Sequence, residues 1–468
     1  MISFLLNDQL IQTEQPEGMV MLDFVRYHQH LKGTKIGCRE GDCGACTVLV
    51  GSRQDGTLRY QSMTSCLMPL SNANGKHIVT IEGLNQLHRL NPIQQAFANE
   101  GATQCGFCTV GFVVSLMGFC VDHTDKTYEN GIAAIDGNIC RCTGYKSIER
   151  AIEQIVNQLQ SIYKTNSLAS LVEAGYLPSY FKEIPQRLEQ LAASTSPAVP
   201  LTKGLNIGGG TDLMVQRPLM VKYTPLKPLY DTSALRFIRQ EGRYLYLGAT
   251  TTAEDMRSSS LLQAIFPNLK AHLKLVSSTP IRNMATLAGN FVNASPIGDL
   301  TVFFLALDST LVLSNGVARR EVQLKDFYLG YKTLDKREDE LVESLYFEVP
   351  ALNVTTPSKA GYFNFEKVCK RTHLDIASVN SALLVHVQGG LITQAYLSAG
   401  GVAPIPKLLS ETSAFLVGKP FQRATLDEAS TIAQNEISPI SDARGTATYK
   451  RLLLRQLLLA HAQKFNLL

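Results

Sequence analysis

The sequence predicts a multidomain α+β protein, and three observations support this class. The chain has 468 residues, about three times the ~150 residues of a single domain, so we expect three or four domains. Stretches with the period of β-strands are interspersed with stretches of helical period. Nine of the ten cysteines lie before residue 143, which indicates metal binding rather than a disulfide scaffold.

The composition excludes several classes of protein. Apolar residues make up 45% of the chain and charged residues 18%, so it is neither disordered nor fibrous. The net charge of +4 is too small to predict nucleic-acid binding. The first ten residues resemble no signal peptide, and the longest apolar stretch, 107–121, is shorter than the ~20 residues of a membrane span. We therefore expect a cytoplasmic protein with no nucleic-acid or membrane partner.

The first predicted domain, residues 1–86, is rich in β-structure. Residues 2–6 and 9–13 alternate weakly in polarity, as in a β-hairpin. A helix is expected around residues 21–31. A loop dense in glycine and cysteine then leads into a strand at 47–50.

The pattern becomes helical at Asn91-Pro92, because Asn91 suits an N-cap and Pro92 the first helical position. We therefore expect a helical unit over residues 87–160. Two closing helices are expected at 423–436 and 445–464. The remaining predicted parts are a proline-containing connector over 161–195 that leads into the run AASTSPAVP, a strand-rich unit over 196–356, and a C-terminal unit over 357–468.

The predicted domain 1–86 contains a C-x4-C-x2-C motif followed by one distant cysteine. These residues are Cys38, Cys43, Cys46 and Cys66. This spacing is typical of plant-type [2Fe–2S] ferredoxins. Glycines between the cysteines let the loop fold tightly around a cluster. A structural zinc site is the alternative, but zinc sites favour paired C-x2-C motifs, so the spacing favours the cluster.

The helical unit contains a C-x2-C motif followed by C-x-C, formed by Cys105, Cys108, Cys140 and Cys142. A C-x2-C motif alone is ambiguous between zinc, a thioredoxin-like redox site and iron–sulfur. Adjacent C-x-C cysteines rarely have the geometry of a disulfide. The spacing therefore leaves zinc and a second [2Fe–2S] cluster open. We expect Cys120 and Cys369 to be buried small hydrophobic residues.

Two later segments are candidates for a nucleotide site. The run LTKGLNIGGGTDL (201–213) has three glycines, which allow close approach to a pyrophosphate, and the hydroxyl of Thr211. It completes neither a G-x-G-x-x-G motif nor a P-loop, so a structural turn is equally open. The segment RNMATLAGNFVNASPIGDL (282–300) either lines a ribose or phosphate site or forms a polar turn.

Several motifs closely resemble the molybdenum hydroxylases, the xanthine dehydrogenase and aldehyde oxidase family. In the iron–sulfur half these are EGDCGACTV (40–48), QCGFCTVGFVVS (104–115) and GNICRCTGYKSI (137–148). In the flavin half they are NIGGGTDL (206–213), TLAGNFVNASPIGD (286–299), FEKVCKRTHLDIASV (365–379) and LSAGGVAPIPKL (397–408). Val110 and Ser147 stand where the family commonly has proline, which leaves the cysteines unchanged.

The resemblance implies four domains: a β-grasp plant-type ferredoxin domain, a helical [2Fe–2S] domain, a vanillyl-alcohol-oxidase-type FAD domain and an α+β flavoprotein C-terminal domain. It implies a [2Fe–2S] cluster at both cysteine sets. Val276 stands near the position where some relatives carry an aromatic residue facing the flavin. The FAD residues implied by the resemblance are Asn206, Ile207, Gly208, Gly209, Gly210, Thr211, Asp212, Leu213, Thr286, Gly289, Asn290, Ser295, Asp299 and Lys367.

The connector LVEAGYLPSYFKEIPQRL (171–188) resembles the bacterial two-subunit xanthine dehydrogenases, in which molybdopterin lies on a separate large chain. The resemblance implies a small subunit in a heterotetramer of two small and two large chains. Electrons would pass from the partner's molybdopterin through two [2Fe–2S] clusters to FAD and then to NAD+, as the partner oxidises hypoxanthine or xanthine to urate. No catalytic side chain is then expected here, because the cofactors carry the redox chemistry.

Three alternatives remain open. A stand-alone flavin–iron–sulfur reductase would show the same motifs. So would the small subunit of a related molybdenum hydroxylase that acts on another heterocycle or on an aldehyde. A structural or sensor protein with two zinc sites would contain neither clusters nor flavin.

Overall fold

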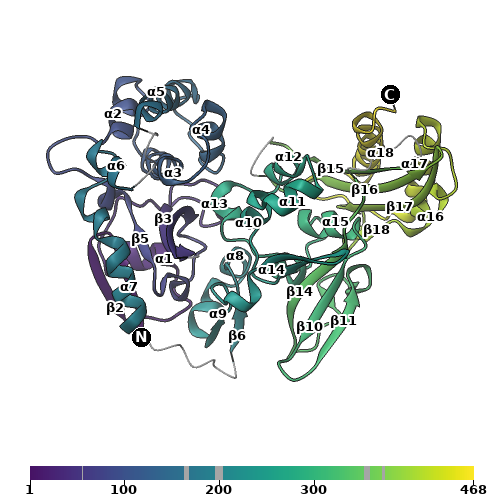
Figure 1. The fold of residues 1–468 in the computed structure, drawn as a ribbon, viewed down its shortest axis with the longest axis horizontal. Helices are drawn as coiled ribbons and strands as arrows, with labels where there is room; N and C mark the ends of the chain where they lie inside the picture. The colour runs from purple at the N-terminus through teal and green to yellow at the C-terminus, as the bar shows by residue number, and fades with distance from the viewer. Residues whose placement is uncertain (55, 163–167, 195–203, 353–358, 372–374, 468) are drawn as a thin grey trace. The chain divides into compact units, whose positions relative to one another are not determined.

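The computed structural model describes residues 1–54, 56–162, 168–194, 204–352, 359–371 and 375–467. Two compact units make up the fold (Figure 1). Residues 1–230 and 278–284 form the first unit, and residues 231–277 and 285–468 the second. Most of the run AASTSPAVP, with the predicted boundary at residue 196, lies outside the described residues. None of the described helices has the length and apolar character needed to cross a membrane.

A five-stranded sheet of order β2-β1-β5-β3-β4 opens the first unit. β1 and β2 form the predicted antiparallel hairpin, and β1 pairs in parallel with β5. The strands are β1 (Ile2–Leu6), β2 (Gln9–Thr13), β3 (Thr47–Gln54), β4 (Thr57–Thr64) and β5 (His77–Val79); short helical turns are α1 (Met21–Asp23), the π-helix η1 (Phe24–His28), and the 3₁₀ turns η2 (Leu70–Ala73) and η3 (Ile81–Leu84).

The helix expected around residues 21–31 is shorter than predicted. After α1 it widens into η1, in which the amide of Gln29 donates to the carbonyl of Phe24, and it ends at His28. Aromatic and β-branched residues such as Phe24 and Val25 favour a regular helix weakly, and π-turns of this kind occur within α-helices.

The helical part of the first unit begins where the sequence predicted. Asn91 and Gln94 form a reciprocal capping box at the start of α2, with Pro92 as the first helical residue. The predicted apolar faces of α3 and α5 are buried in one core. The helices are α2 (Pro92–Asn99), α3 (Thr109–Val121), α4 (Tyr128–Ala134) and α5 (Lys146–Ile162).

The segment that was expected to be a connector is largely helical. It contains α6 (Leu168–Glu173), the 3₁₀ turn η4 (Ser179–Lys182) and α7 (Ile184–Ser194). Phe181 is fully buried in the helical core, and Leu188 packs against Leu5 of the sheet region. Pro178 precedes η4 and Pro185 is the second residue of α7, positions that proline tolerates.

Two later segments complete the first unit. Residues 204–230 contain β6 (Leu205–Ile207), α8 (Leu213–Gln216), α9 (Pro218–Tyr223) and β7 (Leu226–Pro228), and residues 278–284 contain α13 (Thr279–Arg282). Their apolar side chains, including Ile207, Met214 and Met284, share a core with the opening sheet. The predicted glycine loop therefore belongs to the same compact unit as both cysteine sets.

The second unit contains two main sheets, of order β11-β10-β14-β9-β8 and β15-β16-β17-β18. The strands are β8 (Ile238–Glu241), β9 (Tyr244–Gly248), β10 (Thr310–Ser314), β11 (Arg319–Gln323), β14 (Leu341–Glu348), β15 (Lys359–Val368), β16 (Val379–Gln388), β17 (Leu391–Gly400) and β18 (Lys407–Leu408), with a small ribbon of β12 (Tyr328–Gly330) and β13 (Thr333–Leu334).

Helices cover these sheets. The predicted closing helices are confirmed as α17 (Arg423–Glu436) and α18 (Ala447–Lys464), which pack with α16 (Ser410–Leu416) on the β15–β18 sheet (Figure 1). The other helices are α10 (Ala253–Ser258), α11 (Ser260–Ile265), α12 (Leu269–Lys274), α14 (Leu287–Asn293) and α15 (Asp299–Leu305), with 3₁₀ turns η5 (Ser233–Leu235) and η6 (Leu324–Asp326).

Candidate iron–sulfur and flavin sites

The first cysteine set is brought together by one loop and the end of one strand. Three of its members lie in the loop between η1 and β3, and the fourth follows β4: Cys38, Cys43, Cys46 and Cys66. Gly41 (φ +80°) and Gly44 (φ +68°) give the loop the left-handed turns that glycine permits. A Cβ atom on Gly37 would lie 2.5 Å from the sulfur of Cys43, so this glycine lets backbone and thiol come close.

Backbone amides in this loop point at sulfur. The amides of Glu40 and Asp42 both donate to Cys38 Sγ at 3.3 Å, and the amide of Cys38 donates to Cys43 Sγ at 3.4 Å. Such bonds stabilise a thiolate over a thiol. The loop therefore has the amide donors that a thiolate-bound iron–sulfur cluster needs.

The first set contains two thiol pairs, Cys38 with Cys43 and Cys46 with Cys66. In each pair, one thiol favours ionisation of the other. The hydrogen bond from Cys43 lowers the pKa of Cys38 to about 5, while the same bond, together with burial, raises the pKa of Cys43. Cys46 and Cys66 behave alike: their shared bond lowers the pKa of Cys46 and raises that of Cys66. Thiolates are the form in which cysteine ligates a metal.

The second cysteine set lies at the junctions of loops with α3 and α5, formed by Cys105, Cys108, Cys140 and Cys142. The sulfurs of Cys105 and Cys142 are 3.7 Å apart, and both residues are exposed. Cys140 is buried, and Cys108 is partly exposed. The C-x2-C and C-x-C motifs therefore face each other, as the spacing predicted for one shared site.

Thr143 supports a thiolate at Cys140. Its hydroxyl and amide donate to Cys140 Sγ at 3.1 and 3.4 Å. Burial acts to raise the pKa of Cys140, but these bonds outweigh it and the pKa is lowered. Burial and the bond to Cys140 raise the pKa of Cys108 to about 12.

Neither set is arranged around one point. Among the described residues, no group of three or more His, Cys, Asp or Glu side chains could hold a single metal ion. The cysteines lie instead in thiol pairs with amide donors, and this donor set fits a [2Fe–2S] cluster. Cys120 is buried as predicted, but Cys369 is not: it follows β15, is partly exposed, and donates to the carbonyl of Arg371.

The glycine loop connects β6 to α8 and carries the first group of predicted FAD residues, Asn206 to Leu213. Within the described part of the chain, the amides of Gly208 to Thr211 donate no hydrogen bond. Asn72 also contacts the loop, because its Nδ2 atom donates to the Gly208 carbonyl at 3.0 Å. Free successive amides beside a glycine turn can bind an anion, so the loop fits a pyrophosphate.

Gly209 has a structural role that its sequence context did not reveal. A Cβ atom there would lie 1.8 Å from the carbonyl oxygen of Met284, which belongs to the same compact unit. Close packing of two backbones therefore requires glycine at this position, whether or not a phosphate is bound. Gly210, with φ +85°, is the residue that turns the loop.

The second group of predicted FAD residues lies in the second unit, around α14 and the start of α15. The hydroxyl of Thr286 caps α14 by accepting from the Gly289 amide at 3.3 Å. Asn290 Oδ1 accepts from the amide and hydroxyl of Thr301, and Ser295 Oγ accepts from the Ile297 amide. These side chains fix the backbone of the segment, and their roles as FAD contacts stay predictions.

Lys367 and Asp299, which were predicted separately, are direct partners. Lys367 Nζ donates to Asp299 Oδ2 at 2.7 Å and to the Leu275 carbonyl at 2.8 Å. Asn380 Nδ2 donates to Asp299 Oδ1 at 2.6 Å. Val276, next to Leu275, is buried in the core of the second unit.

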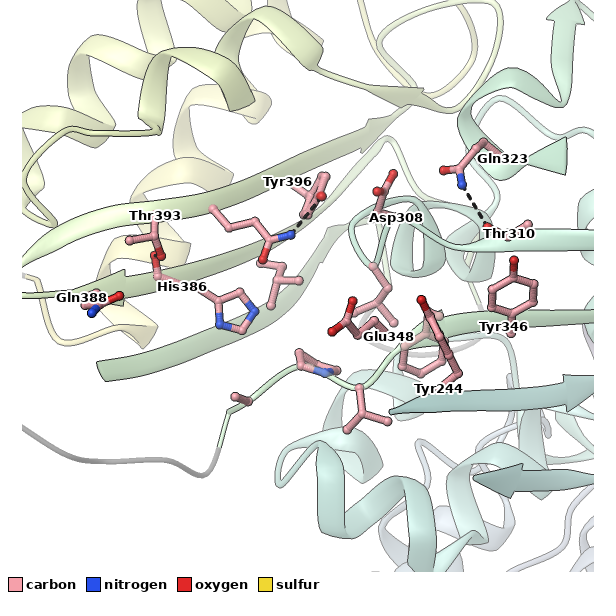
Figure 2. A pocket seen from close by; sticks show the side chains of 17 residues that line it. Tyr244, Asp308, Thr310, Gln323, Tyr346, Glu348, His386, Gln388, Thr393 and Tyr396 are labelled. Carbon is pink, nitrogen blue, oxygen red and sulfur yellow. Dashed lines mark hydrogen bonds between the residues drawn. The ribbon is translucent and has the colours of Figure 1, made fainter. Parts of the chain in front are cut away.

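The second unit also contains a cavity of about 500 Å³ that the sequence did not predict. It lies between residues of β9, β10 and β14 and residues of β16 and β17, and Figure 2 shows Tyr244 and Tyr346 on one side and His386 on the other. Asp308 and Glu348 add carboxylates to its lining. None of the predicted FAD residues lines this cavity.

The sequence did not reveal three residues that contact the predicted site residues but lie far from them in the chain. Asn72, Met284 and Asn380 contact predicted residues between 75 and 136 positions away in the chain. Asn380 carried no signal, because it lies within an apolar strand. Met284 lies in the family-like segment 282–300, but nothing in its residue type indicated contact with a glycine.

Four domain families match the chain in order. The 2Fe-2S iron-sulfur cluster binding domain matches residues 4–71, and the [2Fe-2S] binding domain matches 80–153. The FAD binding domain in molybdopterin dehydrogenase matches 182–351, and the CO dehydrogenase flavoprotein C-terminal domain matches 365–464. The predicted fold and its resident cofactors, two [2Fe–2S] clusters and FAD, are thereby confirmed. All eight cysteines of the two sets fall within the two cluster-binding matches.

Known proteins resemble the chain over nearly its whole length. A xanthine dehydrogenase from Emericella nidulans is 29% identical over 97% of this chain and 38% of its own length. Aldehyde oxidase 1 from Rattus norvegicus is 24% identical over 96% of this chain and 38% of its own length. The chain thus spans less than two fifths of these relatives. A reconstituted CO dehydrogenase from Oligotropha carboxidovorans has a TM-score of 0.50 and 27% identity, covering 54% of this chain and 86% of that one.

Proposed function

Since its four domains match the iron–sulfur and FAD subunit of the xanthine dehydrogenase and aldehyde oxidase family, we propose that this chain transfers electrons from a molybdopterin-containing partner to an external acceptor. The observation that carries the proposal is the presence of two cluster-type cysteine sets and a glycine loop in one compact unit. Electron transfer between cofactors requires that they be held close together, and a shared unit provides this.

The residues proposed to hold the cofactors have separate tasks. Bound [2Fe–2S] clusters supply one-electron transfer, and FAD collects two electrons and delivers hydride. The eight cysteines of the two sets provide the thiolates, and the amides of Glu40, Asp42 and Thr143 stabilise their charge. The amides of the glycine loop bind the pyrophosphate of FAD.

The partner docks, in this proposal, at the second cysteine set. Three large apolar side chains are exposed around it: Phe107 (46%), Ile139 (39%) and Tyr145 (36%). Phe107 lies between Cys105 and Cys108, and the Tyr145 hydroxyl accepts from the Cys140 amide. We call these three side chains the cluster-face patch. Exposed apolar side chains gathered around a redox site support a protein–protein interface there.

We further propose that the complete enzyme is a cytoplasmic xanthine dehydrogenase with NAD+ as acceptor, assembled from two small and two large chains. The partner would oxidise hypoxanthine or xanthine to urate. The xanthine dehydrogenase relatives support this substrate. The aldehyde oxidase relative supports a second candidate, in which the partner oxidises an aldehyde.

Co-purification tests the proposal. The tagged chain should retain a second chain that contains molybdopterin, and xanthine or hypoxanthine should bleach the iron–sulfur absorption of the complex. Phe107→Asp should abolish retention of the second chain but leave the absorption of the isolated chain unchanged. Leu219→Asp is the matched control, because Leu219 is an exposed apolar residue (72%) on α9, outside the cluster-face patch.

Two results would contradict the proposal. Retention of no molybdopterin-containing chain would favour a stand-alone reductase. Bleaching by aldehydes but not by purines would favour the second candidate.

A further inference from the structure

The two cysteine loops contact each other through their backbones. The amide of Ile139 donates to the carbonyl of Cys43 at 3.1 Å. Beside this bond, Nδ2 of Asn138 donates to the carbonyl of Gly44 at 3.2 Å. Cys43 belongs to the first set, and Ile139 directly precedes Cys140 of the second set. One hydrogen bond therefore joins Cys43, a predicted ligand in the first set, to the residue directly before Cys140, a predicted ligand in the second set.

Glycines make this approach possible. A Cβ atom on Gly44 would lie 2.4 Å from both Asn138 Nδ2 and the Gly137 carbonyl. A Cβ atom on Gly111, at the start of α3, would lie 2.2 Å from the Gly44 carbonyl. A side chain at Gly44 would separate the two loops, and one at Gly111 would push α3 away from Gly44.

Asn138 contributes only its donor end to this contact. Its residue exposure is 6%, so the contact is almost free of solvent. Its Oδ1 atom is buried without a hydrogen-bond partner among the described residues. The bond to Gly44 is therefore what fixes the orientation of the side chain across the two loops.

We propose that Asn138 is a positioning residue that holds the two loops at hydrogen-bond distance and thereby sets the rate of electron transfer between their clusters. This inference rests on the proposed function, in which each cysteine set holds a [2Fe–2S] cluster. One electron would cross, so the cluster held by one set would be oxidised by one electron and the cluster held by the other reduced by one. No proton moves and no covalent bond changes. A bonded route between the two sets runs from the Cys43 carbonyl through the Ile139 amide to Cys140.

The test uses the purified full chain and needs no partner. Asn138→Leu has similar volume and no donor. Iron and sulfide content should be unchanged. In the fully reduced protein, however, the splitting of the electron paramagnetic resonance signals that arises from spin coupling between the clusters should weaken. Equilibration of an electron between the clusters after flash reduction should slow severalfold, because the electronic coupling between two redox centres weakens as their separation grows.

Asn91→Leu is the matched control, because Asn91 is also a buried asparagine whose Nδ2 donates to a backbone carbonyl, that of Leu84, at 3.2 Å. It should leave both the splitting and the rate unchanged. Asn138→Ser, whose hydroxyl is too short to replace the bond, should reproduce the effect with less change in packing.

Wild-type splitting and rate in both Asn138 variants would overturn the proposal. Loss of a cluster from both variants would also overturn it, because Asn138 would then be a structural support. Absence of clusters from the unsubstituted chain would contradict the proposed function itself, and iron and sulfide analysis distinguishes that case.

Discussion

Lys367 and Asp299 form an ion pair of 2.7 Å although 68 residues separate them in the chain. Their side chains are 1% and 13% exposed, so the pair lies mostly outside solvent. Asn380 and the Leu275 carbonyl complete its hydrogen bonds. The pair joins β15 to the start of α15, and it orders the segment that carries the second group of predicted FAD residues.

Removing the lysine should destabilise the second unit strongly. Lys367→Met leaves the Asp299 carboxylate buried without its cation, which should lower the free energy of unfolding by about 3–5 kcal/mol. Denaturant unfolding followed by circular dichroism measures this. Arg423→Met is the control, because it removes a surface ion pair with Asp427 and should cost less than about 1 kcal/mol. Equal losses in the two variants would show that the Lys367–Asp299 pair is not special.

The contact between Gly209 and Met284 predicts the effect of a single methyl group. Gly209→Ala should separate the two backbones, lower the free energy of unfolding by about 1–3 kcal/mol and reduce FAD content. Flavin absorbance and thermal unfolding measure the two effects. Gly330→Ala is the control, because a Cβ atom there meets nothing within 4 Å. Full FAD content in Gly209→Ala would remove the glycine loop from the proposed site.

Because His77 is buried in its neutral form, we expect the folded protein to lose stability in acid. Burial lowers the pKa of His77 to about 3, and its ring lies between the Tyr60 hydroxyl and the Asn7 carbonyl. The unfolded chain therefore binds a proton below about pH 6.5 that the folded chain does not. His77 should therefore contribute a fall in stability of about 1.4 kcal/mol per pH unit from pH 6.5 towards pH 3, and no pH dependence above pH 6.5.

Denaturant unfolding at several pH values measures this slope. His77→Gln should make the curve shallower by about one proton between pH 6.5 and 4.5. His88→Gln, at an exposed position, should leave the curve unchanged. An identical slope in the wild type and His77→Gln would exclude His77 as its source.

The proposed relay runs from the second cysteine set, where the partner docks, through the first set to FAD, and a substitution of Cys43 tests this order. In the assembled complex, Cys43→Ser should remove the first cluster, so iron should fall to about half while the second cluster stays visible. A purine substrate should still reduce the second cluster, but NAD+ reduction should fall sharply. Cys120→Ala, at a buried cysteine outside both sets, should retain all iron. NAD+ reduction at the wild-type rate in Cys43→Ser would show that electrons bypass the first set.

Features that depend on local sequence were predictable. The hairpin at the N-terminus, the capping box at Asn91 and the two four-cysteine sets all follow from spacing over a few residues or from residue types with specific chemistry. The resemblance to a known family added the assignment of the second set, which spacing alone left open between zinc and iron–sulfur. The fold and cofactors predicted in this way are those of the matching domain families.

Features that depend on tertiary contacts were not predictable. Asp136 and Arg282 form a buried ion pair across 146 residues, and it attaches α13 to the loop before Cys140. Neither residue stood out, since an isolated charge in a polar segment usually faces solvent. Likewise, the prolines of the connector favoured a linker in the sequence analysis, although the segment forms helices whose apolar residues pack into the first unit. Only the three-dimensional packing distinguishes such segments from a linker.

The cofactor content of the purified chain tests the proposed electron-transfer function most directly. Iron, acid-labile sulfide and flavin should be measured together on the chain purified without added metal. Two Cys₄ [2Fe–2S] sites and one flavin site predict about four iron, about four sulfide and about one FAD per chain. One zinc ion per cysteine set, with no sulfide and no flavin, would show that this chain is not an electron-transfer protein.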